Sequence, residues 1–184
     1  MSTKEIQKID VTVAIPQGVQ AELVGALLKV KGPKGEVQRD FVSKVVKLSK
    51  ADNKIELTTD IASRHGKRII YSFVSHVKNM LAGVLNPYVY RLKVCSGHFP
   101  ISIKLEKDKV LISNFLGEKV PRISKILANA KVDQQGDIIT VEGPDLENVS
   151  QTAANLETAT KIRNRDRRRF QDGIYLLEKA GIKI

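Results

Sequence analysis

The chain has 184 residues, enough for one large domain or two small ones, and its 42% hydrophobic residues can build real cores rather than a disordered chain. A net charge of +11, from 31 Lys and Arg against 20 Asp and Glu, suits a polyanionic partner such as RNA, DNA or an anionic membrane surface. With a single cysteine, Cys95, no signal-peptide pattern and no stretch of ~20 apolar residues, we expect a cytoplasmic protein without a membrane segment.

The first half of the chain shows strand patterns followed by a helical one. Hydrophobic residues alternate from Ile9 to Ile15, as a half-buried strand requires. Further strands are expected at residues 27–30, 37–41 and 55–58, with a hairpin turn at 31–35. From about residue 60 to 83 the period becomes helical, and one face of this helix collects Ile69, Phe73, Val77, Leu81 and Val84.

The second half repeats this order. Strands are expected at residues 88–94, 101–105 and 110–113. A second helix begins at Pro144 or Asp145 and runs to about residue 161, because hydrophobic or small side chains recur there at helical spacing: Leu146, Val149, Ala153, Leu156 and Thr160.

The two halves can be aligned with each other. Residues 30–36 match 112–118, and residues 47–60 match 131–145, at a separation of about 82 residues. The segments 47–60 and 131–145 each read as a strand, a polar turn (51–53 and 134–137), a second strand and the start of a helix. The sequence therefore predicts an α+β protein made of two tandem similar modules, residues 1–82 and 83–184. In each module we expect an antiparallel sheet packed against one helix. Glycine and proline at 83–87 (GVLNP) mark the boundary.

Catalytic and metal-binding patterns are poorly supported. Cys95 and His98 form a C-x-x-H pair without a second pair, and a structural zinc site needs four ligands. The loop at 31–35 (KGPKG) is favoured as a tight turn over a phosphate-binding loop, since it neither ends in Lys-Ser/Thr nor opens a helix. We expect no enzyme activity, no cofactor, no metal and no small-molecule substrate.

Residues 161–169 (KIRNRDRRR) form the strongest functional signal. Six of the nine positions are basic: Lys161, Arg163, Arg165, Arg167, Arg168 and Arg169. A solvated helix end favours one or two cations through the helix dipole, but not six. Arginine binds two phosphate oxygens at once and stacks on bases, so this segment favours nucleic-acid binding.

Two other polar groups have less decisive interpretations. Asp145 fits a helix cap, whereas the polar edge formed by Asn148, Ser150 and Gln151 suits either capping or hydrogen bonds to RNA, and both remain open. Cations at the start of the first helix, Arg64, Lys67 and Arg68, are favoured as a solvated face.

Three motifs together resemble the L-six family of large-subunit ribosomal proteins, in its archaeal and eukaryotic branch. They are NFLGEK at 114–119, GPDLENVSQTAA at 143–154 and RDRRRFQDGIY at 165–175. Residues 58–71 and 88–101 fit the family as well.

The resemblance implies two similar α+β domains from a duplication and a structural role without catalysis. It also implies binding to large-subunit ribosomal RNA, chiefly through the second domain, near the region where translation factors dock. The partners would be that RNA and neighbouring ribosomal proteins in the cytoplasmic ribosome. By resemblance, the RNA contacts fall within residues 143–151 and 161–169.

Two other functions are weighed against this one. An RNA-processing or RNA-modifying protein with a basic docking domain would need a cluster of acids, histidines or a metal site, and the sequence shows none. An architectural DNA-binding protein is the third candidate.

Overall fold

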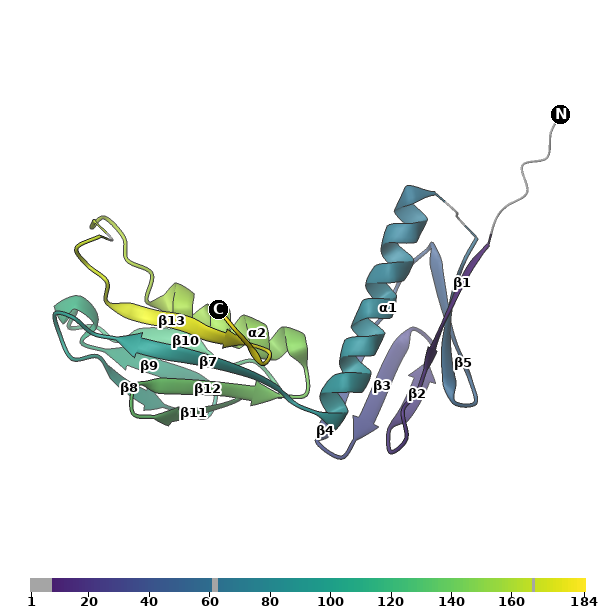
Figure 1. Cartoon of the computed structure of the whole chain (residues 1–184), viewed down its shortest axis with the longest axis horizontal. Coiled ribbons are helices and arrows are strands. Elements are labelled where there is room, and N and C mark those ends of the chain that lie inside the picture. Colours follow the sequence, from purple (N-terminus) through teal and green to yellow (C-terminus); the bar gives the residue numbers. More distant parts are fainter. Residues whose placement is uncertain (1–7, 61–62, 167) are drawn as a thin grey trace. The chain divides into compact units, whose positions relative to one another are not determined.

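The computed structural model describes residues 8–60, 63–166 and 168–184. Its contacts divide the chain into two compact units, Met1–Asn86 and Pro87–Ile184. Each unit has its own hydrophobic core, and the two are described separately below (Figure 1).

The first unit contains two three-stranded antiparallel sheets and one long helix. The sheets have the orders β1-β6-β5 and β2-β3-β4. The strand bounds are Ile9–Ala14 (β1), Gln20–Val24 (β2), Leu27–Gly32 (β3), Gly35–Asp40 (β4), Val46–Ala51 (β5) and Lys54–Thr59 (β6). Helix α1 spans Arg64–Leu85.

Helix α1 begins and ends where local chemistry requires it. The Ser63 hydroxyl accepts a hydrogen bond from the Gly66 N–H at 3.2 Å and caps the first turn, so the helix begins later than residue 60. It continues past Gly83 to Leu85 and ends at Asn86, whose extended conformation is the one favoured before Pro87.

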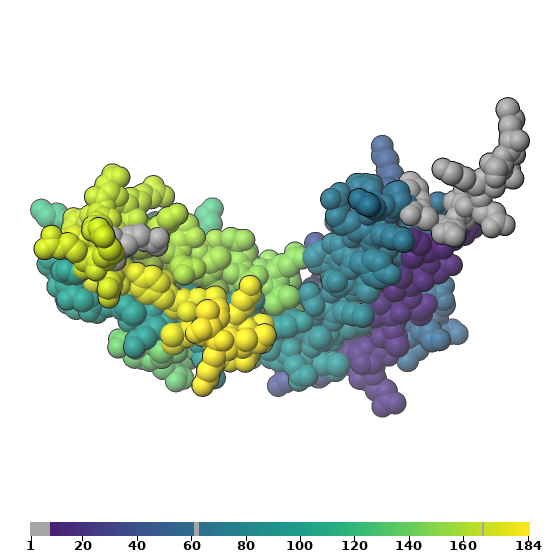
Figure 2. Space-filling model, turned by 45° about the horizontal axis from the view of Figure 1, so that its top comes forward, coloured from purple at the N-terminus to yellow at the C-terminus, as the bar shows by residue number. Residues whose placement is uncertain are grey.

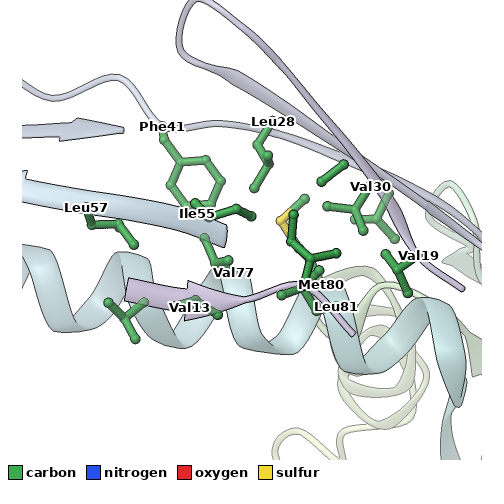
Figure 3. Close-up of a cluster of buried hydrophobic side chains, with 14 of the residues drawn as sticks. Val13, Val19, Leu28, Val30, Phe41, Ile55, Leu57, Val77, Met80 and Leu81 are labelled. Carbon is green, nitrogen blue, oxygen red and sulfur yellow. The ribbon is translucent and has the colours of Figure 1, made fainter. Parts of the chain in front are cut away.

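The core of the first unit lies between α1 and the strands. Figure 3 shows Val77, Met80 and Leu81 of α1 facing Leu28 and Ile55 from the sheets. Val77, Leu28 and Ile55 have no exposed surface. Of the predicted face of α1, Val77, Leu81 and Val84 are buried, whereas Ile69 and Phe73 are half-buried at its edge. Ile70, Val74 and Met80 complete the buried face.

The second unit contains a three-stranded sheet, a five-stranded sheet and one helix. The orders are β10-β9-β8 and β11-β12-β7-β13-β14. Helix α2 spans Leu146–Ala159. The strand bounds are Tyr88–Cys95 (β7), Ser102–Leu105 (β8), Lys109–Ser113 (β9), Arg122–Lys125 (β10), Lys131–Gln135 (β11), Ile138–Gly143 (β12), Gly173–Lys179 (β13) and Ile182–Lys183 (β14).

The two units share one topology. The order β1-β6-β5 recurs as β7-β12-β11, and β2-β3-β4 recurs as β8-β9-β10. In each unit one helix follows the sixth strand, α1 after β6 and α2 after β12. The predicted α+β fold with two similar modules is confirmed. Each module divides its strands between two sheets, because three consecutive strands (β2–β4 and β8–β10) pair with one another in hairpins and not with the remaining strands.

Candidate nucleic-acid interface

The basic segment at residues 161–169, called here the basic loop, connects α2 to β13. Helix α2 is capped at Thr160 and has no basic residue in its last turn. Lys161 directly follows the cap, and the other cations come later in the chain, so the helix dipole does not account for the segment as a group. Figures 1 and 2 show the connection between α2 and β13 at the surface of the second unit.

The described cations of this loop are all exposed: Lys161, Arg163, Arg165, Arg168 and Arg169. Arg167 lies outside the described residues. Ile162 is only 8% exposed, so a single apolar side chain between Lys161 and Arg163 fixes the start of the loop to the core.

The loop is also fixed where it leaves α2. The Ile174 N–H of β13 donates to the Thr160 hydroxyl at 2.9 Å. Arg122 on β10 donates through Nη1 to the Ala159 carbonyl at 2.8 Å and to the Lys161 carbonyl at 3.2 Å. The Arg122 guanidinium lies 4.3 Å from the centre of the Phe115 ring, and Glu118 holds it through two further hydrogen bonds. Arg122 is thus a brace between β10 and the start of the basic loop.

Asp172 fixes the far end. Its side chain has no exposed surface, and its carboxylate accepts hydrogen bonds from the backbone N–H groups of Gly97 at 2.7 Å and His98 at 3.3 Å. The His98 Nδ1 lies 3.2 Å from the same carboxylate. Burial alone would raise the pKa of Asp172. The hydrogen bonds from Gly97 and His98 outweigh this effect, so the pKa lies below its ordinary value of 3.8. An ionised buried carboxylate therefore ties the loop to the end of β7.

An aromatic stack holds one of the cations. The rings of His98 and Phe170 are stacked with centroids 4.9 Å apart. The Arg165 guanidinium lies over Phe170, with Cζ 4.9 Å from the ring centre. A cation held over an aromatic face has less conformational freedom to lose when it binds an anion.

The remaining cations differ in how far their charge is compensated. Arg168 pairs with Asp166, with Nη2 and Oδ2 3.0 Å apart, and the hydrogen bonds from Arg168 hold the pKa of Asp166 below its ordinary value. Within the described part of the chain, no ion pair is found for Lys161, Arg163 or Arg169. The loop thus carries uncompensated positive charge, as phosphate binding requires.

The polar edge lies at the opposite end of α2. Asn148 donates to the Asp145 carboxylate at 2.7 Å, Ser150 to the Glu147 carbonyl at 3.1 Å, and Gln151 to the Asn155 side chain at 2.9 Å. Asp145 itself caps the helix by accepting from the Glu147 N–H at 3.0 Å. A helix rises about 1.5 Å per residue, so ~12 Å of helix separates Gln151 from Ala159, the last residue of α2. The structure does not join Asn148 and Ser150 to the basic loop, whereas Gln151 is linked through Asn155 to the groove described next, which Lys161 and Arg163 also line.

Two basic residues that the sequence analysis did not single out lie near the loop. Arg122 and Lys125 are on β10, and together with Lys161 and Arg163 they surround a groove of about 650 Å³. The available signal was their spacing in PRISK at 121–125, but the four-residue strand that carries them was not recognised.

Other kinds of site find no support in the residues that the structure describes. No group of three His, Cys, Asp or Glu in them is arranged to hold a metal ion. Neither α1 nor α2 is long and apolar enough to cross a membrane. Cys95 is a partly exposed free thiol at the end of β7.

A duplicated α+β fold whose second module carries an anchored loop of uncompensated cations defines a class of protein suited to binding a polyanion. Comparison with known proteins specifies the class. The family model of Ribosomal protein L6 matches residues 15–86 and 99–173, one segment in each module. The chain belongs to this family, whose members are structural proteins of the large ribosomal subunit and not enzymes.

Archaeal relatives are similar over most of the chain. The large ribosomal subunit protein uL6 of Saccharolobus solfataricus is 48% identical, over 93% of this chain and 95% of its own. The uL6 of Nanoarchaeum equitans is 47% identical over 94% of each chain. The uL6 of Aeropyrum pernix is 44% identical over 92% of this chain and 94% of its own. The resemblance drawn from the three motifs is thereby confirmed, and with it a place in the ribosome, which is cytoplasmic.

Proposed function

We propose that the protein binds large-subunit ribosomal RNA mainly through its second module. The basic loop (Lys161, Arg163, Arg165, Arg167, Arg168 and Arg169) provides the main contacts, and Asn148, Ser150 and Gln151 provide further hydrogen bonds. Family membership supports the RNA as partner. A position near the translation-factor docking region, beside other ribosomal proteins, rests on the family resemblance alone.

The observation that carries this proposal is an exposed cationic loop held firmly at both ends. Asp172 and Arg122 fix its two ends, and Phe170 supports Arg165. Phosphate contacts of this kind position a protein on RNA without reading its sequence. A pre-ordered loop loses little conformational freedom on binding, so its cations contribute more of their attraction to affinity.

The test measures the salt dependence of binding. The full-length protein with Arg163→Gln and Arg169→Gln is compared with wild type in filter binding to large-subunit ribosomal RNA. If each arginine neutralises one phosphate, the log–log salt slope shrinks by ~0.7–0.9 per residue replaced.

The matched control replaces Lys104 and Lys107 by Gln. These two exposed lysines lie in the second module on and after β8, and the same charge is removed. We expect an unchanged slope for the control. Equal losses in both proteins would show that diffuse charge, not the basic loop, binds the RNA.

A further inference from the structure

A groove runs between the edge strand β10 and the C-terminal half of α2. Figure 1 shows these two elements beside each other, with the basic loop leaving the end of α2. Ile123 and Lys125 line one side of the groove, and Asn155 and Thr158 line the other. Its volume of about 650 Å³ is that of a site for a small ligand or for one or two units of a polymer.

The groove is basic and contains no acidic side chain. Four cations line it, Arg122, Lys125, Lys161 and Arg163, while Asp and Glu are absent from its lining. Arg122 is already engaged by Glu118 and by the carbonyls of Ala159 and Lys161. The other three have no ion-pair partner among residues 8–60, 63–166 and 168–184.

These free cations converge on the groove from two elements. Lys125 is exposed on β10, and Lys161 and Arg163 come from the start of the basic loop. The braces between the two elements keep the groove in place, since Arg122 binds the Ala159 carbonyl and Asn155 donates to the Lys125 carbonyl at 3.2 Å. Ile123 is 58% exposed and, two residues from Lys125, lies on the same face of the strand.

We propose that this groove holds a sugar–phosphate segment of RNA, with Lys125 and Arg163 on neighbouring phosphates and Ile123 against a sugar or base. The inference rests on the proposed function and extends the RNA contact from the basic loop to β10. RNA backbone is favoured over an acidic protein segment, because Lys161 and Arg163 belong both to the groove and to the basic loop.

The first experiment places a negative charge in the groove. Thr158 is exposed on α2, and no hydrogen bond of its side chain is found in the described structure, so replacing it leaves the braces intact. Thr158→Glu should weaken binding of the full-length protein to large-subunit ribosomal RNA by about tenfold, because its carboxylate faces a phosphate. Thr158→Gln introduces a side chain of the same size as Glu but without its charge, and this variant should bind RNA almost as tightly as wild type.

The second experiment removes one cation. Lys125→Gln should reduce the salt slope of RNA binding by ~0.7–0.9, whereas Lys104→Gln, on the opposite edge strand β8 of the same sheet, should leave it unchanged.

If Thr158→Glu and Thr158→Gln bind equally and Lys125→Gln keeps the wild-type slope, the groove does not bind RNA. The proposed function would then still stand if Arg169→Gln, in the basic loop but outside the groove, lowers the slope. A loss of binding to purified ribosomal proteins with unchanged RNA binding would also overturn the inference, in favour of a protein partner.

Discussion

Asp172 combines full burial with an ionised carboxylate, and its charge is stabilised by hydrogen bonds from Gly97 and His98. Replacement by Asn keeps the shape but loses the charge-assisted hydrogen bonds, so we expect Asp172→Asn to lower the free energy of unfolding by about 2–3 kcal/mol at pH 7. Urea unfolding of the full-length protein measures this difference. Asp166→Asn, on an exposed carboxylate, is the control and should have little effect.

The pH dependence of that difference follows from the direction of the pKa shift. The pKa of Asp172 is lower in the folded protein than its ordinary value of 3.8. Its stabilising contribution is therefore complete above pH 3.8 and is lost as the pH falls from there through the folded pKa. The difference between wild type and Asp172→Asn should shrink over the same range. A difference that stays constant down to pH 2 would contradict an ionised Asp172.

Ser124 is also a buried polar residue, but its hydroxyl lacks the hydrogen bonds that stabilise Asp172. Its side chain is 3% exposed, and its hydroxyl is the one buried side-chain polar atom without a hydrogen-bond partner in the described part of the chain. Removing an unsatisfied buried hydroxyl relieves a desolvation penalty, so Ser124→Ala should raise the free energy of unfolding by about 1 kcal/mol. Thr160→Val, which removes a buried hydroxyl that accepts from Ile174, should lower it. Chemical denaturation tests both, and a destabilised Ser124→Ala would be the contrary result.

At the residue scale, the sequence identified the cations but not what holds them. The run from Lys161 to Arg169 is visible because like charges are adjacent in the chain. The Asp172–His98 contact joins residues 74 apart, which no local pattern reveals. From the sequence, His98 stood out only as half of a C-x-x-H pair, and neither this contact nor its stacking on Phe170 was expected.

At the scale of elements, Gly143 shows how closely β12 approaches the chain around it. A Cβ at this position would meet the Asn129 carbonyl oxygen and would lie 2.8 Å from Val149 Cγ2. Because a backbone oxygen cannot rotate away as a side chain can, we expect Gly143→Ala to destabilise the second module by about 2–4 kcal/mol.

Thermal denaturation measures that loss, and Gly136 provides the control. Gly136 lies in the turn between β11 and β12 with φ of +59° and open space around it. Asn tolerates this conformation, so Gly136→Asn should cost little. If Gly143→Ala unfolds at the wild-type temperature, the chain near Asn129 has room to move.

The helices and most strands were predictable because their hydrophobic periods are long or regular. Strand β10 (RISK) has Ile123 as its one hydrophobic residue, and the inward positions of β2 (QAELV) are Ala21 and Leu23, so alternation does not stand out in either strand. The equally short β8 and β9 are richer in hydrophobic residues and were predicted. Strand β13 was not predicted, since an Asp-Gly pair such as Asp172-Gly173 is typical of a turn, yet Ile174 is fully buried and pairs with Val94 of β7. Pairing between distant strands, rather than local pattern, makes GIYLLEK a strand.

At the scale of the whole molecule, the two modules share a topology but have diverged around it. In the second module β7 pairs with both β12 and β13. Its equivalent in the first module, β1, pairs within the described residues only with β6. The basic loop lies between α2 and β13, in a segment without a counterpart in the first module. Duplication therefore accounts for the shared fold, and the added strand provides the second anchor of the loop.

This arrangement predicts different roles for modules of similar charge. The core of the second unit is formed by residues of Pro87–Ile184 alone, so a fragment of residues 87–184 should fold by itself. It should retain most of the affinity of the full chain for large-subunit ribosomal RNA, because it carries the basic loop and the β10–α2 groove. The fragment of residues 1–86 should also fold, because it contains all of α1, including the fully buried Val84 near its C-terminal end. Circular dichroism establishes that both fragments are folded, and filter binding at one salt concentration compares them. Equal affinity of the two fragments would show that RNA binding follows overall charge and not the anchored loop.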